Sequence, residues 1–154
     1  MSKLAFTSQW NAVKAWLESA SAAELAALSP RPAVKRGQPE QWEDLIDPWL
    51  VIIDLLGSDQ DRSRATASNT HQTWGTGFRV YCAARGATMD LADEACLSVV
   101  SAICNDFSGS GSYAGTDRST LFTAIVDRWS WDPGNDNDML SMAFVDITAT
   151  FYRH

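Results

Sequence analysis

The side chain best suited to acid–base chemistry is His71, the only histidine other than the last residue, His154. An imidazole titrates near neutral pH and is the natural general base in this chain. No serine or cysteine stands in a known nucleophile setting such as Gly-x-Ser-x-Gly. We therefore expect His71 to be a core or helix-end histidine, and we expect the protein not to be an enzyme.

Metal binding is the next possibility, because cysteines and clustered acidic residues are common metal ligands. Cys96 and Cys104 stand eight residues apart, which on one helix is too far for a shared ion or a disulfide. The segment from Asp132 to Asp138 gathers oxygen ligands as calcium sites do, but it departs from the EF-hand order. We expect two core cysteines, an acidic turn that caps the last helix, and no metal or cofactor.

Two aromatic residues are candidates for contact with a partner. The stretch 108–115, with the sequence SGSGSYAG, predicts a loop, and it lacks the lysine and the preceding strand of a phosphate-binding loop. Tyr113 in this loop offers a large contact area at a low ordering cost. Trp131, beside the Pro133-Gly134 turn, is the tryptophan we expect to be exposed. Tyr113 and Trp131 are therefore predicted partner-binding residues.

The most distinctive pattern is a run of seven acidic residues without Lys or Arg between Gly37 and Asp61. At about 100° per residue, five of these carboxylates fall on one side of a helix, opposite an apolar face with two tryptophans. The run therefore predicts an amphipathic helix with an acidic ridge. The ridge comprises Glu40, Glu43, Asp44, Asp47 and Asp54.

Two features decide whether this acidic ridge is continuous and exposed. Pro48 either kinks the predicted helix or divides it into two short ones. The next segment, 62–85, holds four basic residues and no acidic ones, so its arginines can either cover the ridge or leave it free. These arginines are Arg62, Arg64, Arg79 and Arg85. The sequence leaves both alternatives open.

Apolar residues recur at helical spacing along the whole chain, and no pair of alternating runs is joined by an Asn-Gly or Asp-Gly hairpin turn. Ser21 and Glu24 have the spacing of a capping box, and Thr88 is the expected cap of a long central helix. The predicted helices cover residues 8–20, 21–28, 39–57, 74–85, 89–107, 117–129 and 137–151. The predicted fold is all-α: a compact bundle of six or seven helices in a single domain, 1–154.

Composition and net charge favour some classes of binding partner over others. The chain has 154 residues, is 45% hydrophobic and carries a net charge of -7. This charge repels nucleic acid and anionic membranes and favours a basic protein partner. The first residues lack the apolar core of a signal peptide, and three cysteines are an odd number, so we expect a cytoplasmic protein. No apolar run is long enough to span a bilayer.

The acidic ridge leads to the main functional hypothesis. We expect a non-enzymatic binding protein that neutralises or regulates a cationic protein, as bacterial immunity proteins and phage-encoded inhibitors do. The alternative is a helical domain or helical enzyme with a small-molecule pocket around His71, Trp74 and Tyr81. The identity of the partner and the oligomeric state do not follow from the sequence.

Overall fold

The computed structural model describes residues 6–37, 49–60, 72–107, 122–132 and 140–153. These residues form a sheet of five strands with three helices, so the all-α prediction is wrong. The elements in chain order are α1 (Phe6–Glu18), α2 (Ala23–Ala26), β1 (Ala33–Arg36), β2 (Trp49–Gln60), β3 (Gln72–Arg85), α3 (Met89–Asp106), β4 (Phe122–Trp131) and β5 (Leu140–Arg153).

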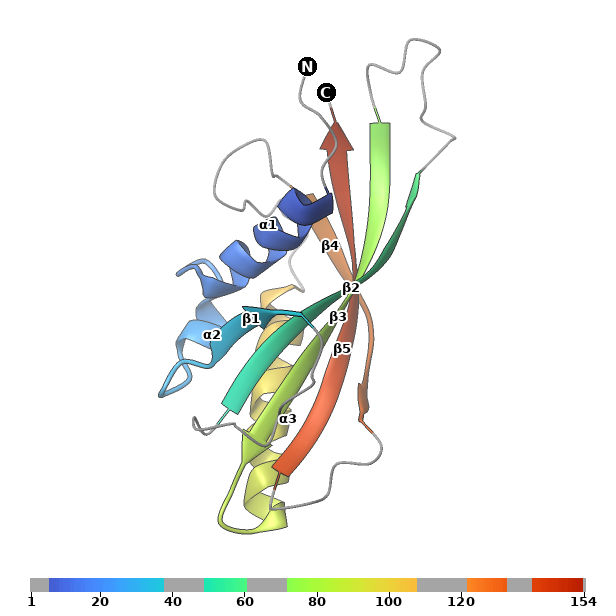
Figure 1. Ribbon diagram of the computed structural model, residues 1–154. Coiled ribbons are helices and arrows are strands. Elements are labelled where there is room, and N and C mark those ends of the chain that lie inside the picture. The colour runs from blue at the N-terminus through green and yellow to red at the C-terminus, as the bar shows by residue number, and fades with distance from the viewer. Residues whose placement is uncertain (1–5, 38–48, 61–71, 108–121, 133–139, 154) are drawn as a thin grey trace.

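The strands are ordered β1-β2-β3-β5-β4 across one sheet. β1 runs parallel to β2, and every other neighbouring pair is antiparallel. In Figure 1 the three helices lie on the same side of this strongly twisted sheet. We call the side under the helices the helix face and the opposite side the second face.

The main core lies between the helices and the helix face. Alternate strand residues point to this face, and they meet the apolar sides of α1 and α3. Burial of each large side chain stabilises the fold by about 1.5–3 kcal/mol. The largest fully buried side chains here are Phe78, Phe107, Phe122, Leu17, Leu25, Ile53, Ile103 and Ile147. This layer fixes the position of α3 over the centre of the sheet.

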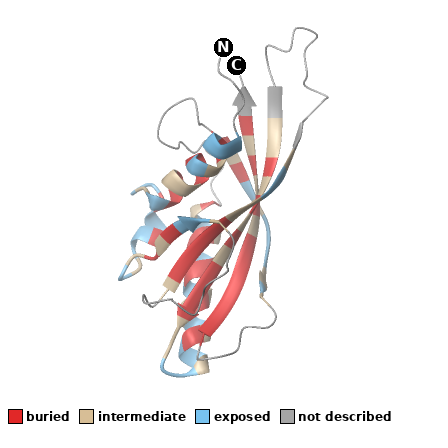
Figure 2. Ribbon diagram, viewed as in Figure 1, coloured by how far each residue is buried: buried red, intermediate tan, exposed pale blue. Residues whose placement is uncertain are grey.

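The second face also carries a buried apolar cluster, although the described helices all pack on the other face. Its members come from β2, β3 and β5 and are Leu50, Ile52, Ala83, Leu140 and Met142. Ala33 and Tyr81 pack against them. Figure 2 shows that burial extends along the central strands. Strands that are apolar on both faces give a nearly continuous hydrophobic run instead of a clean alternation.

This two-sided burial explains why β3 and β5 were predicted as helices. The predicted helical stripe on 137–151 combined Phe144, which belongs to the second face, with Ile147 and Phe151, which belong to the helix face. In β3, Phe78 and Val80 alternate with the half-buried Arg79 and Tyr81, which is a strand pattern. The two-residue period therefore outweighs the helical spacing in both segments.

The helices predicted over 39–57 and 117–129 are also wrong in their described parts, because 49–60 form β2 and 122–131 form β4. The run Val51-Ile52-Ile53 in β2 is β-branched, which favours a pleated strand. Gly57 does not end a helix but lies at a register shift in β2 with a φ of 146°, a conformation that favours glycine. Pro48 lies outside the described residues.

The other three predicted helices are confirmed as α1, α2 and α3. Thr88 caps α3 as expected, since its hydroxyl accepts a hydrogen bond from the Leu91 amide at 3.3 Å. The predicted capping box of α2 is wrong, because Ala22 is the N-cap residue and supplies no side-chain bond. Asp106 at the end of α3 takes that role instead, which ties the two helices together.

Candidate functional site

The predicted acidic ridge does not form one helical surface in the described structure. Asp54 lies in β2, where side chains alternate between the faces instead of following a helical stripe. The other four members, Glu40, Glu43, Asp44 and Asp47, lie outside the described residues. Among the acidic residues that the structure does describe, two settings bear on binding, one on the sheet and one on the helices.

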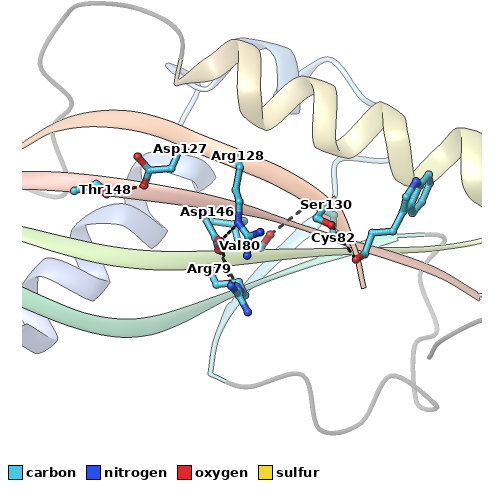
Figure 3. A network of polar contacts seen from close by, with 9 residues as sticks. Arg79, Val80, Cys82, Asp127, Arg128, Ser130, Asp146 and Thr148 are labelled. Atoms are coloured by element: carbon cyan, nitrogen blue, oxygen red, sulfur yellow. Dashed lines mark hydrogen bonds and ion pairs between the residues drawn. The ribbon is translucent and has the colours of Figure 1, made fainter. Parts of the chain in front are cut away.

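The setting on the sheet is a row of alternating charges across four adjacent strands of the second face. Asp54 of β2 stands opposite Arg79 of β3, Arg79 opposite Asp146 of β5, and Asp146 opposite Arg128 of β4. The Arg79 guanidinium donates to both Asp146 carboxylate oxygens, at 2.8 and 3.1 Å, and Arg128 Nε donates at 3.0 Å. Figure 3 shows both arginines converging on Asp146. We call these four residues the charge row.

The two carboxylates of the charge row differ in their electrostatics. Burial raises the pKa of Asp54, and the nearby Arg79 only partly opposes this effect. Burial acts in the same direction on Asp146, but the hydrogen bonds and charges of Arg79 and Arg128 outweigh it and lower the pKa. Both arginines also lie over the Phe144 ring, at 4.1 and 5.3 Å from its centroid. Asp146 is therefore a fixed structural anion.

Only two of the four arginines that could cover the predicted acidic ridge are described. Arg79 is committed to Asp146, its hydrogen-bonded partner in the charge row. Arg85 is half-buried at the end of β3. Arg62 and Arg64 lie outside the described residues, as do four of the five members of the predicted ridge.

The second acidic setting is a shallow groove of about 530 Å³ between α2 and α3. Among the described residues of its lining, Glu24 and Glu94 are the charged ones, and both are exposed. The remaining lining is small, apolar or neutral polar: Ala27, Leu28, Leu97, Ser98, Ser101, Ala102 and Asn105. Neither glutamate forms an ion pair with another described residue. We call this feature the acidic groove.

Asp106 sets the geometry of the acidic groove. Its two carboxylate oxygens accept hydrogen bonds from the backbone amides of Glu24 and Leu25, at 2.9 and 3.0 Å. These amides belong to the first turn of α2, so a carboxylate from α3 substitutes for an N-cap side chain. Burial raises the pKa of Asp106, although the two amides oppose the shift. The contact holds Glu24 beside the outer face of α3.

The charge of α3 is the signal that the sequence analysis missed. Between Met89 and Asp106 the helix carries four acidic residues, Asp90, Asp93, Glu94 and Asp106, and no basic residue. The apolar content of this segment drew attention to its core side, although Asp90 and Glu94 are exposed and Asp93 accepts a hydrogen bond from Ser141 at 2.7 Å. A charge count restricted to this one confirmed helix identifies the acidic surface.

Two of the three residues of the predicted alternative pocket, Trp74 and Tyr81, are not brought together. Trp74 packs edge-on against Phe6 of α1 at 5.4 Å, so it lies on the helix face. Tyr81 packs against Phe144 at 6.2 Å on the second face. Two residues on opposite faces of one sheet do not line the same pocket. His71 lies outside the described residues.

The two predicted aromatic contact residues have different outcomes. Trp131 is 41% exposed, which confirms its expected exposure, and it lies on the strand β4. Trp129 is 44% exposed and packs edge-on against Trp131 at 5.8 Å, so these two residues form an exposed aromatic pair. The structure does not bring Trp131 next to Asp54, which lies in β2 on the far side of β3 and β5. Tyr113 lies outside the described residues.

The cysteines behave as core residues. Cys82 and Cys96 are buried, Cys104 is half-buried, and all three are free thiols. Burial raises the pKa of each thiol, to about 12 for Cys96, so none of them is an activated nucleophile. Of the acidic turn 132–138, only Asp132 is described. Within the described ranges, no group of three His, Cys, Asp or Glu side chains is placed to hold a metal ion.

Comparison with known proteins gives no family for this chain: no family model matches it, and no curated protein matches it. None of the described helices is both long enough and apolar enough to cross a membrane.

Proposed function

We propose that this protein is a non-enzymatic binding protein whose acidic groove receives a cationic segment of a protein partner and so neutralises or regulates that partner. The observation that carries the proposal is the charge of the groove, where Glu24 and Glu94 face solvent and no basic residue is found among the described residues of the lining. In this role the protein would resemble bacterial immunity proteins and phage-encoded inhibitors, which neutralise a protein partner.

The lining of the acidic groove supports this choice of partner. Leu28 and Leu97 are half-buried and provide apolar contact, while the two carboxylates provide charge. A lysine or arginine side chain has both properties, because its apolar stem packs on the leucines while its charged end reaches a carboxylate. The net charge of -7 would attract such a partner from a distance and repel nucleic acid.

The cellular setting that we propose is the cytoplasm. Three free thiols, two of them buried, are typical of proteins from a reducing compartment. In that setting abundant anionic polymers compete with this acidic chain for a basic partner, so a charged groove with apolar walls gives selectivity that charge alone does not give.

Affinity capture from a native extract tests the proposal. The immobilised protein is compared with a Glu24→Lys/Glu94→Lys variant that keeps its circular dichroism spectrum, at low and at high salt. We expect a basic protein to bind the unmodified chain at low salt, to elute as the salt rises, and to be lost from the variant. Capture of the same proteins by both chains would overturn the assignment of the groove.

A further inference from the structure

The strand β4 is one edge of the sheet and has an unusual surface for an edge. It pairs with β5 on one side, and no other described strand pairs with its outer side. Ile125, Trp129 and Trp131 are 67%, 44% and 41% exposed, so three of its ten residues are large apolar side chains in contact with water. An edge of this kind is a template for pairing with another strand.

The backbone polarity of β4 follows from its pairing with β5. The Asp132 amide donates to the Met142 carbonyl at 3.0 Å, and backbone groups of alternate residues point to opposite sides of an antiparallel strand. The backbone amide and carbonyl groups of Trp129 and Trp131 therefore point away from β5. β5 pairs with β3 without a register shift, so its backbone groups alternate regularly between β3 and β4. Ala149 and Ile147 use theirs toward β3, and their partners in β4, Ala124 and Val126, therefore also have backbone amide and carbonyl groups that point outward.

A register shift between Val126 and Arg128 changes which face each half of β4 presents. Before the shift, Ala124 and Val126 lie on the helix face. After the shift, Trp129 and Trp131 lie opposite Val145 and Ala143, which are helix-face residues. The second face receives the residues between them: Ile125, Asp127, Arg128 and Ser130.

Asp127 is the extra residue at this register shift, because Val126 pairs with Ile147 and Arg128 with Asp146, the next residue of β5. This inserted residue makes β4 complementary to itself. When two copies of β4 are aligned antiparallel about a twofold axis between Asp127 and Arg128, each Asp127 stands opposite the other copy's Arg128. Val126 then stands opposite Trp129, and Ala124 opposite Trp131, always on the same face. All four of these residues have outward backbone groups, so each pair can exchange hydrogen bonds. In a strand without the register shift, the same axis would place opposite faces against each other.

We propose that β4 pairs with β4 of a second copy of this chain in an antiparallel twofold dimer that joins two five-stranded sheets. The charges favour this occupant over an unrelated strand, because Asp127 and Arg128 are both exposed and neutralise each other twice across the axis. Figure 3 shows that Asp127 is held by Thr148, and Arg128 by Asp146, which presets their positions on the second face. Pairing would also cover Ile125 and the aromatic pair.

Bulges and charges on an edge strand also serve to prevent pairing, which gives the test its opposite outcome. Sedimentation equilibrium measures the dimer dissociation constant of the purified full chain up to about 1 mM. We expect a reversible dimer. A chain that stays monomeric over this range would show that the inserted residue protects the edge, and it would overturn the proposal.

Two charge variants make the test specific. Asp127→Arg places arginines opposite arginines, and Arg128→Asp places aspartates opposite aspartates, so each variant alone should weaken the dimer at least about tenfold. Mixed together, the two variants again place opposite charges across the axis and should form a heterodimer. A mixture that associates no better than either variant alone would contradict the proposed register.

Two controls separate pairing from folding. Lys35→Glu reverses an exposed charge on β1, the opposite edge, and should leave the dissociation constant unchanged. Trp129→Pro removes an outward amide that the β4–β5 ladder does not use, and should abolish the dimer while the circular dichroism spectrum is kept. A dimer that tolerates Trp129→Pro and both charge variants would not be formed by β4.

Discussion

The acidic residues of the charge row and those of the acidic groove have opposite environments. In the charge row, Asp54 and Asp146 alternate with two arginines, and Asp146 is 14% exposed. In the acidic groove, Glu24 and Glu94 are exposed and have no described ion-pair partner. The first set neutralises itself within the sheet, whereas the second leaves its negative charge at the surface.

This difference separates residues that serve the fold from residues available to a partner. Carboxylates that are buried and paired contribute to stability, and they lose that contribution when one partner is removed. Exposed, unpaired carboxylates contribute little to stability but act on a charged partner through the surrounding water.

Removal of the Asp146 carboxylate, which lies between the two arginines of the charge row, should have the largest effect on the free energy of unfolding. We expect Asp146→Ala to lower the free energy of unfolding by about 2 kcal/mol, because two charged hydrogen-bond donors lose their acceptor. Urea denaturation followed by circular dichroism measures this loss. Thr148→Val on the same strand, which removes one exposed hydrogen bond to Asp127, should have a smaller effect. Equal losses in the two variants would mean that the charge row is not a special source of stability.

Reversal of charge in the acidic groove should change binding and spare the fold. We expect Glu94→Lys to weaken binding to the captured basic partner about tenfold, with a free energy of unfolding within about 0.5 kcal/mol of the unmodified chain. Glu18→Lys on α1 is the control for binding, because it makes the same change of net charge outside the groove, although it also removes the surface ion pair between Lys14 and Glu18. The separation of roles fails if both variants weaken binding equally.

The charge row should also determine how stability depends on pH. The folded pKa of Asp146 is lowered, so the stability it provides is present above its unfolded pKa of about 3.9 and is lost as the pH falls through the folded value. The difference in unfolding free energy between the unmodified chain and Asp146→Asn should therefore be constant near neutral pH and shrink below about pH 4. A constant difference down to the acid transition would contradict the lowered pKa.

Replacement of Asp54 should have the smallest effect on the free energy of unfolding, and its contribution to stability should depend on pH in the opposite direction to that of Asp146. Burial raises its pKa, so the folded state favours the neutral carboxyl, and its charge lowers stability once the pH rises above the unfolded value. We expect Asp54→Asn to change the free energy of unfolding at neutral pH by less than about 0.5 kcal/mol. A loss as large as that of Asp146→Ala would show that Asp54 is a full member of the structural ion-pair network.

The sequence predicted the helical part of the fold better than the sheet. α1 and α3 have one apolar side and one polar side, and Thr88 marks the start of α3, so their periodicity and capping were sufficient. β2 and β5 are apolar on both faces over part of their length, and this pattern hides the two-residue period. The β-branched run at Val51–Ile53 was the signal that could have corrected the assignment of β2. The lengths of β2 and β5, 12 and 14 residues, are themselves typical of helices.

The candidate site was only partly predictable because it depends on a contact between residues that are far apart in the chain. The net negative charge and the choice of a basic partner follow from composition, and the exposure of Trp131 followed from its neighbouring turn. The acidic groove needs Glu24 and Glu94, which are far apart in the chain and meet only because the Asp106 carboxylate holds the first turn of α2. No local pattern encodes that contact.

The measurement that tests the acidic groove most directly is the association rate of the captured partner as a function of ionic strength. Stopped-flow tryptophan fluorescence gives this rate for the unmodified chain and for Glu24→Lys/Glu94→Lys between about 10 and 500 mM salt. We predict that the unmodified chain associates at least about tenfold faster at low salt than at high salt, and that the variant loses most of this dependence. Superimposable curves for the two chains would contradict the assignment of the groove as the binding site.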